Sequence, residues 1–440
     1  MELSLLFCVF RCSYWKEVSC MQPIRSILSF ILSLSMLCGC TGAPAGPSPS
    51  AVSPLPRPEG EVETVVSNCE AVSPDSLSGF GVELLNASRQ EGENALISPL
   101  SVVLALSMTA NGAQGETLEQ FEEAFGMDQD SLNALCAGLL AKYNALGGST
   151  EGNLVNSLWA DPDLTVEPEF LRRCVDLYAA QVFQRDLQAP ETVQAVNAWV
   201  KEATRELISS VVDRFDEQAV LALVNAVYLK NQFARPFETP SSDWKMDFTA
   251  SDGTVFHPSG MSNGTRTEQY IAAQDARGVL LPYDDERLGL LLMRPEDGVS
   301  LTDYLSGWDD GTIRALLESR VEAEVNLTVP KFKAQWSGNL NDPLASMGLA
   351  DAFDMGKADF GAMGSSPNGP LFIGQVIHKT VFELNEKGTE AAAVTAVVMD
   401  AACALPPADL IELHFDRPFV YAIVDLETGF PLFLGTLEKP

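Results

Sequence analysis

Residues Glu386–Ala396 decide the fold of this chain, and they read EKGTEAAAVTA. Gly388 supplies backbone freedom near the start of the segment, and most of the residues that follow are small. If the segment is a strand, the odd positions from Thr389 to Met399 carry no charge and both acids fall on the other face. One face could then be buried in a sheet. Because Glu, Lys and Ala also favour helices, a helix is the alternative for this stretch taken alone.

The sequence on either side favours the strand. Upstream, Ile377–Asn385 alternates polar and apolar residues, and downstream Asp416–Pro440 reads DRPFVYAIVDLETGFPLFLGTLEKP. These blocks resemble the serpin family. The segment that opens this section is similar to the family's hinge consensus E-x-G-T-E-A-A-A-x-T, and the downstream block is similar to its C-terminal signature.

Further blocks extend the resemblance over most of the chain. Ser98 can cap a helix and Pro99 fits its first turn, as in the family helix that begins with Ser-Pro. The matching blocks, in chain order, are Ile97–Thr117, Leu223–Phe248, VPKF at Val329–Phe332 and MGLADAFD at Met347–Asp354. The resemblance implies an α+β serpin fold with three β-sheets, eight or nine helices and an exposed reactive-centre loop.

Hydrophobic periodicity agrees with an α+β class, since helical patterns come early in the chain and antiparallel strands come late. The expected helices are Ser76–Ser88, Pro99–Ala110, Thr117–Phe125, Ser131–Tyr143, Glu167–Tyr178 and Thr192–Ile208. The expected strands are Gly152–Ala160, Leu221–Leu229, Gly278–Arg294 and Glu322–Pro330, followed by a hairpin of Phe419–Asp425 and Pro431–Thr436.

The N-terminal residues have the composition of a targeting region. Arg25 precedes a short apolar run that ends at Cys38-Gly39-Cys40, which resembles a bacterial lipoprotein signal with Cys40 as the lipid-bearing residue. We therefore expect a signal at residues 1–39, a Pro/Ser-rich tether at 40–64 and a serpin domain at 65–440. Met21 is a natural start, so residues 1–20 are interpreted as a mis-annotated extension. A single N-terminal membrane anchor is the alternative.

This pattern predicts an exported protein, lipid-anchored to the outer face of a bacterial membrane or released extracellularly. The chain of 440 residues has a formal charge of −32, which disfavours nucleic-acid binding because phosphate recognition needs clustered cations. Attachment to a membrane would then rest on the lipid. We expect a monomer without cofactor.

Nine cysteines are present, and five of them lie at or before Cys40. The remaining four, Cys69, Cys136, Cys174 and Cys403, match no zinc or redox spacing. Cys136 and Cys174 are expected to be buried thiols in helices.

A serine-hydrolase reading rests on Ser262, the centre of the G-x-S-x-G sequence at Gly260–Gly264. That motif requires a strand before the serine and a helix after it, and neither pattern is present. The three histidines, His257, His378 and His414, lack metal-ligand spacing, so we expect no metal site.

The resemblance assigns roles to individual residues. A polar cluster beneath the main sheet, which we call the shutter, would consist of Ser98, Ser101, Asn225 and His378. An ion pair at the base of the loop, the breach pair, would join Lys331 and Glu386. The hinge itself would comprise Glu386, Gly388, Thr389, Glu390, Ala391, Ala392 and Ala393. The family usually has Trp where this chain has Phe233, which removes an indole donor from the breach.

A serpin is not an enzyme, and the resemblance implies an inhibitor that forms a covalent complex with a target serine protease. After cleavage of the loop, the loop would insert as a new central strand while still acyl-linked to the protease. The spacing between hinge glycine and scissile bond in the family implies a reactive bond at Ala402–Cys403, although the second half of this loop is longer than usual and could shift the register. The small side chains there favour elastase-like or subtilisin-like targets. A non-inhibitory serpin with a binding or structural role is the alternative.

Overall fold

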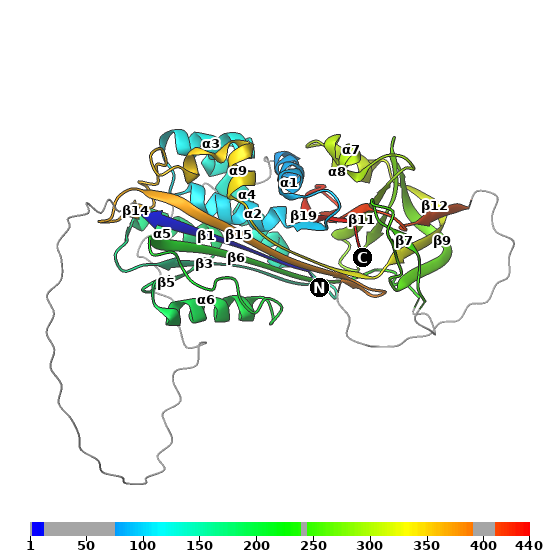
Figure 1. Cartoon of the computed structure of the whole chain (residues 1–440), viewed down its shortest axis with the longest axis horizontal. Helices are drawn as coiled ribbons and strands as arrows, with labels where there is room; N and C mark the ends of the chain where they lie inside the picture. The colour runs from blue at the N-terminus through cyan, green and yellow to red at the C-terminus, as the bar shows by residue number, and fades with distance from the viewer. Residues whose placement is uncertain (1, 13–74, 239–243, 390–409) are drawn as a thin grey trace, which may run out of the picture.

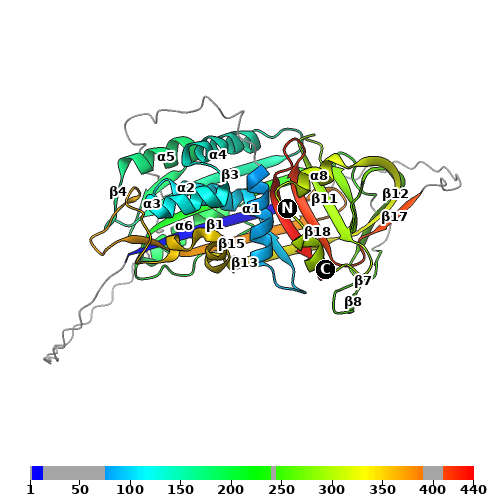
Figure 2. The same cartoon turned by 90° about the horizontal axis from the view of Figure 1, so that it is seen from above.

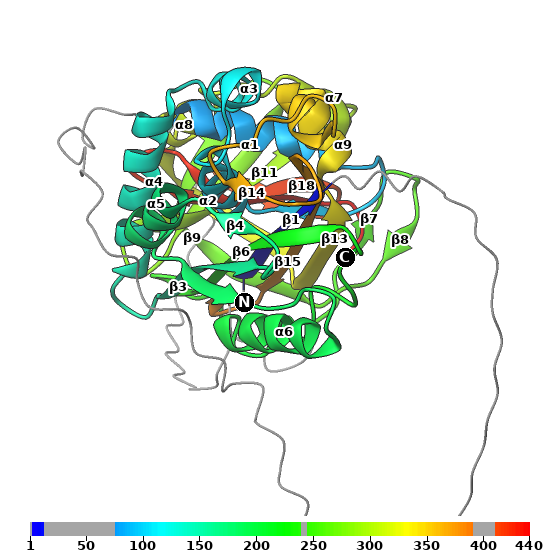
Figure 3. The ribbon, with the colours of Figure 1, turned by 90° about the vertical axis from the view of Figure 1, so that its left-hand side faces the viewer.

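The computed structural model describes residues 2–12, 75–238, 244–389 and 410–440. In this part of the chain a long β-sheet runs across the molecule, and helix α6 covers one of its faces while α2, α3, α4 and α9 lie over the other (Figure 1). The end-on view in Figure 3 shows the same two layers of helices around the sheet. The predicted α+β class is confirmed, with nine α-helices in the described residues.

The long sheet has seven strands in the order β13-β15-β1-β6-β3-β5, with β16 paired to the end of β6. Their bounds are β1 Glu2–Cys12, β3 Glu151–Ala160, β5 Gln181–Gln184, β6 Ala219–Gln232, β13 Phe332–Asn339, β15 Leu371–Leu384 and β16 Gly388–Thr389.

Strand β1 differs from the sequence-based expectation, which put residues 1–39 in a targeting region outside the folded domain. In the structure Glu2–Cys12 is an internal strand, antiparallel to both β15 and β6. Leu6, Cys8 and Phe10 alternate along the strand and are fully buried in the main core. Two strands that face each other across a gap leave their N–H and C=O groups unpaired, so a third segment with an alternating apolar face can join both.

The second large sheet lies at one end of the first, as the view from above shows (Figure 2). Its eight strands follow the order β17-β12-β9-β10-β11-β18-β19-β2. Their bounds are β2 Ala95–Ile97, β9 Gly260–Ala272, β10 Ala276–Pro282, β11 Leu288–Pro295, β12 Val321–Pro330, β17 Ile411–His414, β18 Phe419–Asp425 and β19 Pro431–Leu437. Because β10 pairs with both β9 and β11, hydrogen bonding is continuous along this sheet.

The expectation of one strand at Gly278–Arg294 was wrong, because the chain turns back between Pro282 and Leu288 and forms the antiparallel pair β10 and β11. A uniformly apolar run on both sides of a polar turn reads as one strand when only hydrophobicity is considered. Two two-stranded sheets complete the described strands, pairing β4 Thr165–Val166 with β14 Gly364–Ser365 and β7 Phe248–Thr249 with β8 Val255–Phe256.

The helices largely match the expected ones. They are α1 Asp75–Ser88, α2 Pro99–Ala110, α3 Gly115–Phe125, α4 Gln129–Asn144, α5 Pro168–Tyr178, α6 Pro190–Ala203, α7 Leu301–Ser306, α8 Thr312–Glu318 and α9 Asn341–Leu344. Helix α6 ends at Ala203, before the expected Ile208, since Arg205 and Glu206 adopt positive φ values that an α-helix cannot contain. Among the described helices, none combines the length and apolar character needed to cross a bilayer.

Helix α2 is entirely buried beneath the long sheet. Its N-cap is Ser98, whose side chain accepts a hydrogen bond from the backbone N–H of Ser101, and Pro99 occupies the first turn. A helix that is apolar on all sides can persist only inside a core, so α2 supplies a fixed platform for the centre of the sheet.

Candidate functional site: the hinge and the slot of the main sheet

The hinge begins with a tight turn at the end of β15. Asn385 and Gly388 exchange two backbone hydrogen bonds of 3.1 and 3.2 Å, and the side chain of Asn385 accepts from the Lys387 N–H at 3.0 Å. After this turn Gly388 pairs with Gln232 and Thr389 with Asn231 on β6. The chain therefore leaves β15 and immediately starts a strand antiparallel to β6.

Gly388 cannot readily be replaced in this turn. Its φ is +135°, a conformation that residues with a Cβ atom rarely adopt. An added Cβ would also lie 2.4 Å from the carbonyl oxygen of Asn231. The glycine predicted as the hinge thus has two independent physical reasons to be glycine.

The breach pair is formed in the structure. Lys331 Nζ lies 2.6 Å from Glu386 Oε1, and both side chains are partly shielded, with exposed fractions of 29% and 15%. The backbone around Glu386 is held as well, since its carbonyl accepts from the N–H of Phe237 at 2.8 Å. Lys331 immediately follows β12, so the pair ties the start of the loop to the second sheet.

Phe233 stands beside the hinge, where the family usually has Trp. Its ring is buried and stacks on Tyr283 at a centroid distance of 5.3 Å, and its N–H donates to the carbonyl of Lys387 at 2.9 Å. The side chain of neighbouring Asn231 is fully buried, yet within the described residues neither of its polar atoms has a hydrogen-bond partner. A buried amide without partners is destabilising, and this one lies at the hinge end of the slot, by which we mean the position between β6 and β15 that β1 fills.

The shutter residues lie together at the middle of the long sheet, and all four are fully buried. The backbone N–H of Ser98 donates to His378 Nε2 at 3.1 Å, and Ser101 Oγ donates to Asn225 Oδ1 at 2.5 Å. Asn225 Nδ2 donates onward to Asn156 Oδ1 at 2.9 Å. Buried polar groups in such a network must exchange partners when the sheet rearranges.

Asn156 was missed by the sequence analysis. Its side chain accepts from Asn225 and donates to the carbonyl of Tyr178 at 2.7 Å, which extends the shutter to β3 and the end of α5. The available signal was an amide between apolar residues of the stretch LVNSLWA in β3, because a buried amide must have a partner.

Asn225 and His378 do not face each other directly. Leu6 of β1 pairs with Asn225 on one side and with His378 on the other. The shutter residues therefore lie on both sides of β1, with Asn225 on β6 and His378 on β15. Ser98 and Ser101, at the start of α2, link the two sides.

Several predicted residues lie outside the described residues, and their roles stay predictions. They are Cys40, Glu390, Ala391, Ala392, Ala393, Ala402 and Cys403. Of the predicted hinge, Gly388 and Thr389 form β16, and Thr389 is fully buried, which agrees with the face assigned to odd positions.

The serine-hydrolase reading is contradicted by the structure. Ser262 lies inside β9, which continues to Ala272, so no helix follows the serine as a nucleophile elbow requires. Its hydroxyl accepts from the Gly264 N–H at 3.1 Å. In the described residues, no cluster of His, Cys, Asp and Glu could hold a metal ion.

The buried thiols behave as predicted. Cys136 and Cys174 are free and fully buried, and burial raises the pKa of Cys136 to about 12. A thiol with so high a pKa is inert at neutral pH, since the thiolate is the reactive form.

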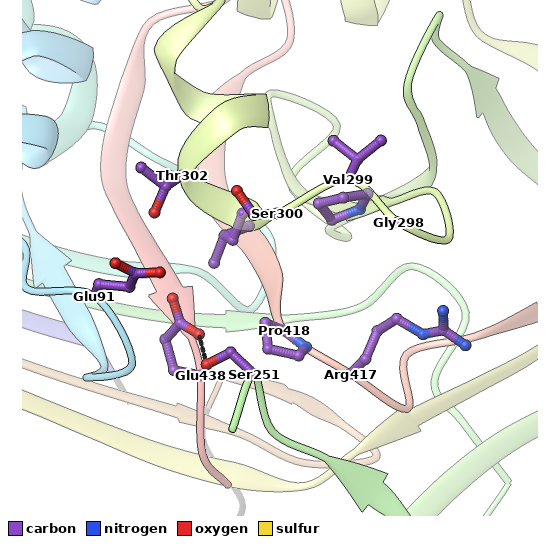
Figure 4. A pocket seen from close by; sticks show the side chains of 11 residues that line it. Glu91, Ser251, Gly298, Val299, Ser300, Thr302, Arg417, Pro418 and Glu438 are labelled. Carbon is purple, nitrogen blue, oxygen red and sulfur yellow. Dashed lines mark hydrogen bonds between the residues drawn. The ribbon is translucent and has the colours of Figure 1, made fainter. Parts of the chain in front are cut away.

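A hollow with a volume of about 300 Å³ lies next to the C-terminal strand, and Figure 4 shows side chains that line it. Glu91, Ser251, Thr302, Arg417 and Glu438 are among the residues that line it, and Ser251 Oγ donates to Glu438 at 3.3 Å. Burial raises the pKa of Glu438. The hollow contains none of the predicted site residues and is separate from the slot.

Comparison with known proteins agrees with this geometry. The family model described as Serpin (serine protease inhibitor) matches residues 75–440. The chain belongs to the serpin family. Members of this family inhibit proteases and form complexes with target serine proteases, so the chain is not an enzyme.

Two relatives and one solved structure illustrate the similarity. A serpin-like protein of Thermococcus kodakarensis is 28% identical over 431 residues, which cover 94% of this serpin and 99% of the relative. The leukocyte elastase inhibitor of Bos taurus is 31% identical, covering 79% and 93% of the two chains. The crystal structure of the thermophilic serpin tengpin in the native state superposes with a TM-score of 0.77 at 30% identity, covering 89% and 98%.

Proposed function

We propose that this serpin inhibits a serine protease by loop insertion. In this proposal residues 390–409 hold the bait sequence, and the cleaved loop enters the long sheet between β6 and β15. The hinge turn at Asn385–Gly388 already directs the chain into that space, and Thr389 is buried there.

The observation that carries the proposal is that the space between β6 and β15 accepts a full additional strand. Strand β1 pairs with both neighbours over most of its length, and it runs in the same direction as β16. A loop strand continuing from Thr389 would make the same kind of ladder. At about 1 kcal/mol net per backbone hydrogen bond, such a strand contributes on the order of 10 kcal/mol.

The chemistry of the trap is a diverted proteolysis. The protease serine oxygen would bond to the carbonyl carbon of Ala402, the peptide bond to Cys403 would break, and the Cys403 amine would leave with the proton. The ester to Ala402 remains until water hydrolyses it. Insertion of the loop before that hydrolysis carries the protease along and distorts its active site.

The side chains around the proposed bond suggest the target class. Ala401, Ala402 and Cys403 are small, so a protease with a small primary pocket, elastase-like or subtilisin-like, would accept them. The bovine relative that is named as an inhibitor of leukocyte elastase is consistent with this class.

The test is the formation of SDS-resistant complexes with an elastase, a subtilisin, a chymotrypsin and a trypsin. Because β1 fills the slot, the assay is run on the full chain and on a full chain carrying Leu6→Asp, which disfavours β1 by placing a charge in the core. A complex with elastase or subtilisin in either chain supports the proposal. Cleavage without any complex in both chains favours a non-inhibitory serpin.

We also propose that the protein is exported and carries a lipid on Cys40, which rests on the signal-like sequence before that residue. Labelling of expressing cells with radioactive palmitate, with Cys40→Ser as the control, tests this. Label retained by the serine variant would refute lipidation at Cys40.

A further inference from the structure

Strand β1 occupies the position that the reactive loop must reach. Thr389 pairs with Asn231 at the end of β6, and Glu2 pairs with Leu229 two residues further along the same strand. A loop strand extended from Thr389 would bring Ala391 opposite Leu229, where Glu2 now pairs. The N-terminal strand thus starts where the described part of the hinge strand stops.

The pairing with β15, the other neighbour of β1, independently gives the same alignment of β1 with the loop. The hinge turn pairs Asn385 with Gly388, so an extended hairpin would bring Ala392 opposite Val381 of β15. Leu3 of β1 holds that place. The pairing with β6 and the pairing with β15 therefore align β1 with the same loop residues. The two alignments agree as far as Val9.

The faces also correspond. In this register Leu6 and Cys8 stand where Thr395 and Val397 would stand after insertion. These are odd positions of the loop, and Thr389, an odd position too, is buried. Leu6 and Cys8 are fully buried in the core, so β1 presents its apolar side where the loop would present its own.

The far end of β1 is fitted to its surroundings by contacts of its own. Phe10 packs edge-on against Phe360 with ring centroids 5.1 Å apart, and Arg11 forms an ion pair with Asp216 at 3.1 Å. Gly374 of β15 lies at the register shift, where an added Cβ would come within 2.4 Å of the Arg11 side chain. The glycine leaves room for the arginine stem.

We propose that Glu2–Cys12 is an internal competitor of the reactive loop, which keeps the slot closed to insertion in any chain that retains it. This inference rests on the proposed function. Two strands cannot occupy one position, so a protease that cleaves the loop of the β1-seated chain would meet a substrate rather than a trap. The connection from β1 to the domain runs through Cys40, so cleavage before Cys40 would detach β1.

Cys8 reports directly whether β1 is seated. It is fully buried, and burial raises the pKa of its thiol to about 12 against an opposing hydrogen bond to Thr109. The native full chain is treated with N-ethylmaleimide, and labelling is read peptide by peptide, with Cys136 as the buried reference. We expect Cys8 to be protected as strongly as Cys136. Rapid labelling of Cys8 in the folded chain would overturn the inference.

The second measurement follows the heat stability of the chain after elastase cleaves the loop. In the full chain we expect no rise of the melting temperature, because β1 holds the slot. In the full chain carrying Leu6→Asp we expect loss of Cys8 protection and a rise of about 10 °C or more after cleavage. The matched control is Leu6→Met, which keeps an apolar side chain of similar volume at the same buried position and should behave as the unmodified chain.

Each outcome has one meaning. A rise of the melting temperature in the unmodified chain, with Cys8 newly reactive, would show that the loop displaces β1 and would refute the block. If Cys8 is exposed by Leu6→Asp and cleavage still brings no rise, the loop does not insert into an open slot, which refutes the proposed function instead. The measurements on the unmodified chain remain decisive should Leu6→Asp fail to fold.

Discussion

Thr389→Arg should convert the inhibitor into a substrate. Thr389 is the first residue after the hinge glycine, it is fully buried, and its hydroxyl lies 3.5 Å from the carbonyl oxygen of Asn231. A guanidinium placed there must lose its water of hydration, because the position is fully buried. The effective penalty for such a buried charge is several kcal/mol.

That penalty acts on the rate at which the loop enters the sheet. If about 3 kcal/mol of it is felt at the transition state, insertion slows by more than about a hundredfold, because each 1.4 kcal/mol is a factor of ten. Hydrolysis of the acyl link does not require insertion and would then occur first. The total gain from the inserted strand, on the order of 10 kcal/mol, does not help a step that is kinetically too slow.

The assay is the stoichiometry of inhibition of elastase, measured in the Leu6→Asp chain so that β1 does not obscure the result. Thr389→Arg should raise the number of inhibitor molecules consumed per protease inactivated, and cleaved inhibitor should accumulate without complex. Thr389→Ser is the matched control, because it keeps the small size and the hydroxyl. An arginine variant with an unchanged stoichiometry would show that insertion does not begin at Thr389.

Three further outcomes are expected. Trypsin should form no stable complex, because no Lys or Arg lies between Gly388 and Asp416; a covalent trypsin complex cleaved within this stretch would disprove the loop assignment. The C-terminal peptide released by the target should begin at Cys403 in mass spectrometry. A peptide that begins at another residue would show that the reactive bond is not Ala402–Cys403. Lys331→Met should lower the free energy of unfolding by only about 1 kcal/mol in urea titrations, since the pair with Glu386 is partly exposed; a loss several times larger would mean that the pair is effectively buried.

The sequence alone predicted a structural feature correctly where the residues of one short segment determine that feature. Helix α2 was predicted with its observed bounds, because Ser98 and Pro99 start it and most of its residues are apolar. Gly388 was predicted to be a hinge because small residues follow it, and its positive φ shows that the position requires glycine, while its hinge role stays a prediction. The shutter and the breach pair were assigned by family resemblance, and the structure brings those residues together.

Tertiary structure alone decided the features that depend on two distant segments meeting. The apolar run at Gly278–Arg294 became two strands, because β10 and β11 each find a different second neighbour. The segment Glu2–Cys12 has the alternation of a strand, but nothing within it specifies a partner. Its place follows from the unpaired edges of β6 and β15 and from a core that accepts Leu6, Cys8 and Phe10. Which remote segments pair as strands depends on their register and on burial in the folded state. The sequence of one segment alone specifies neither its register nor its burial.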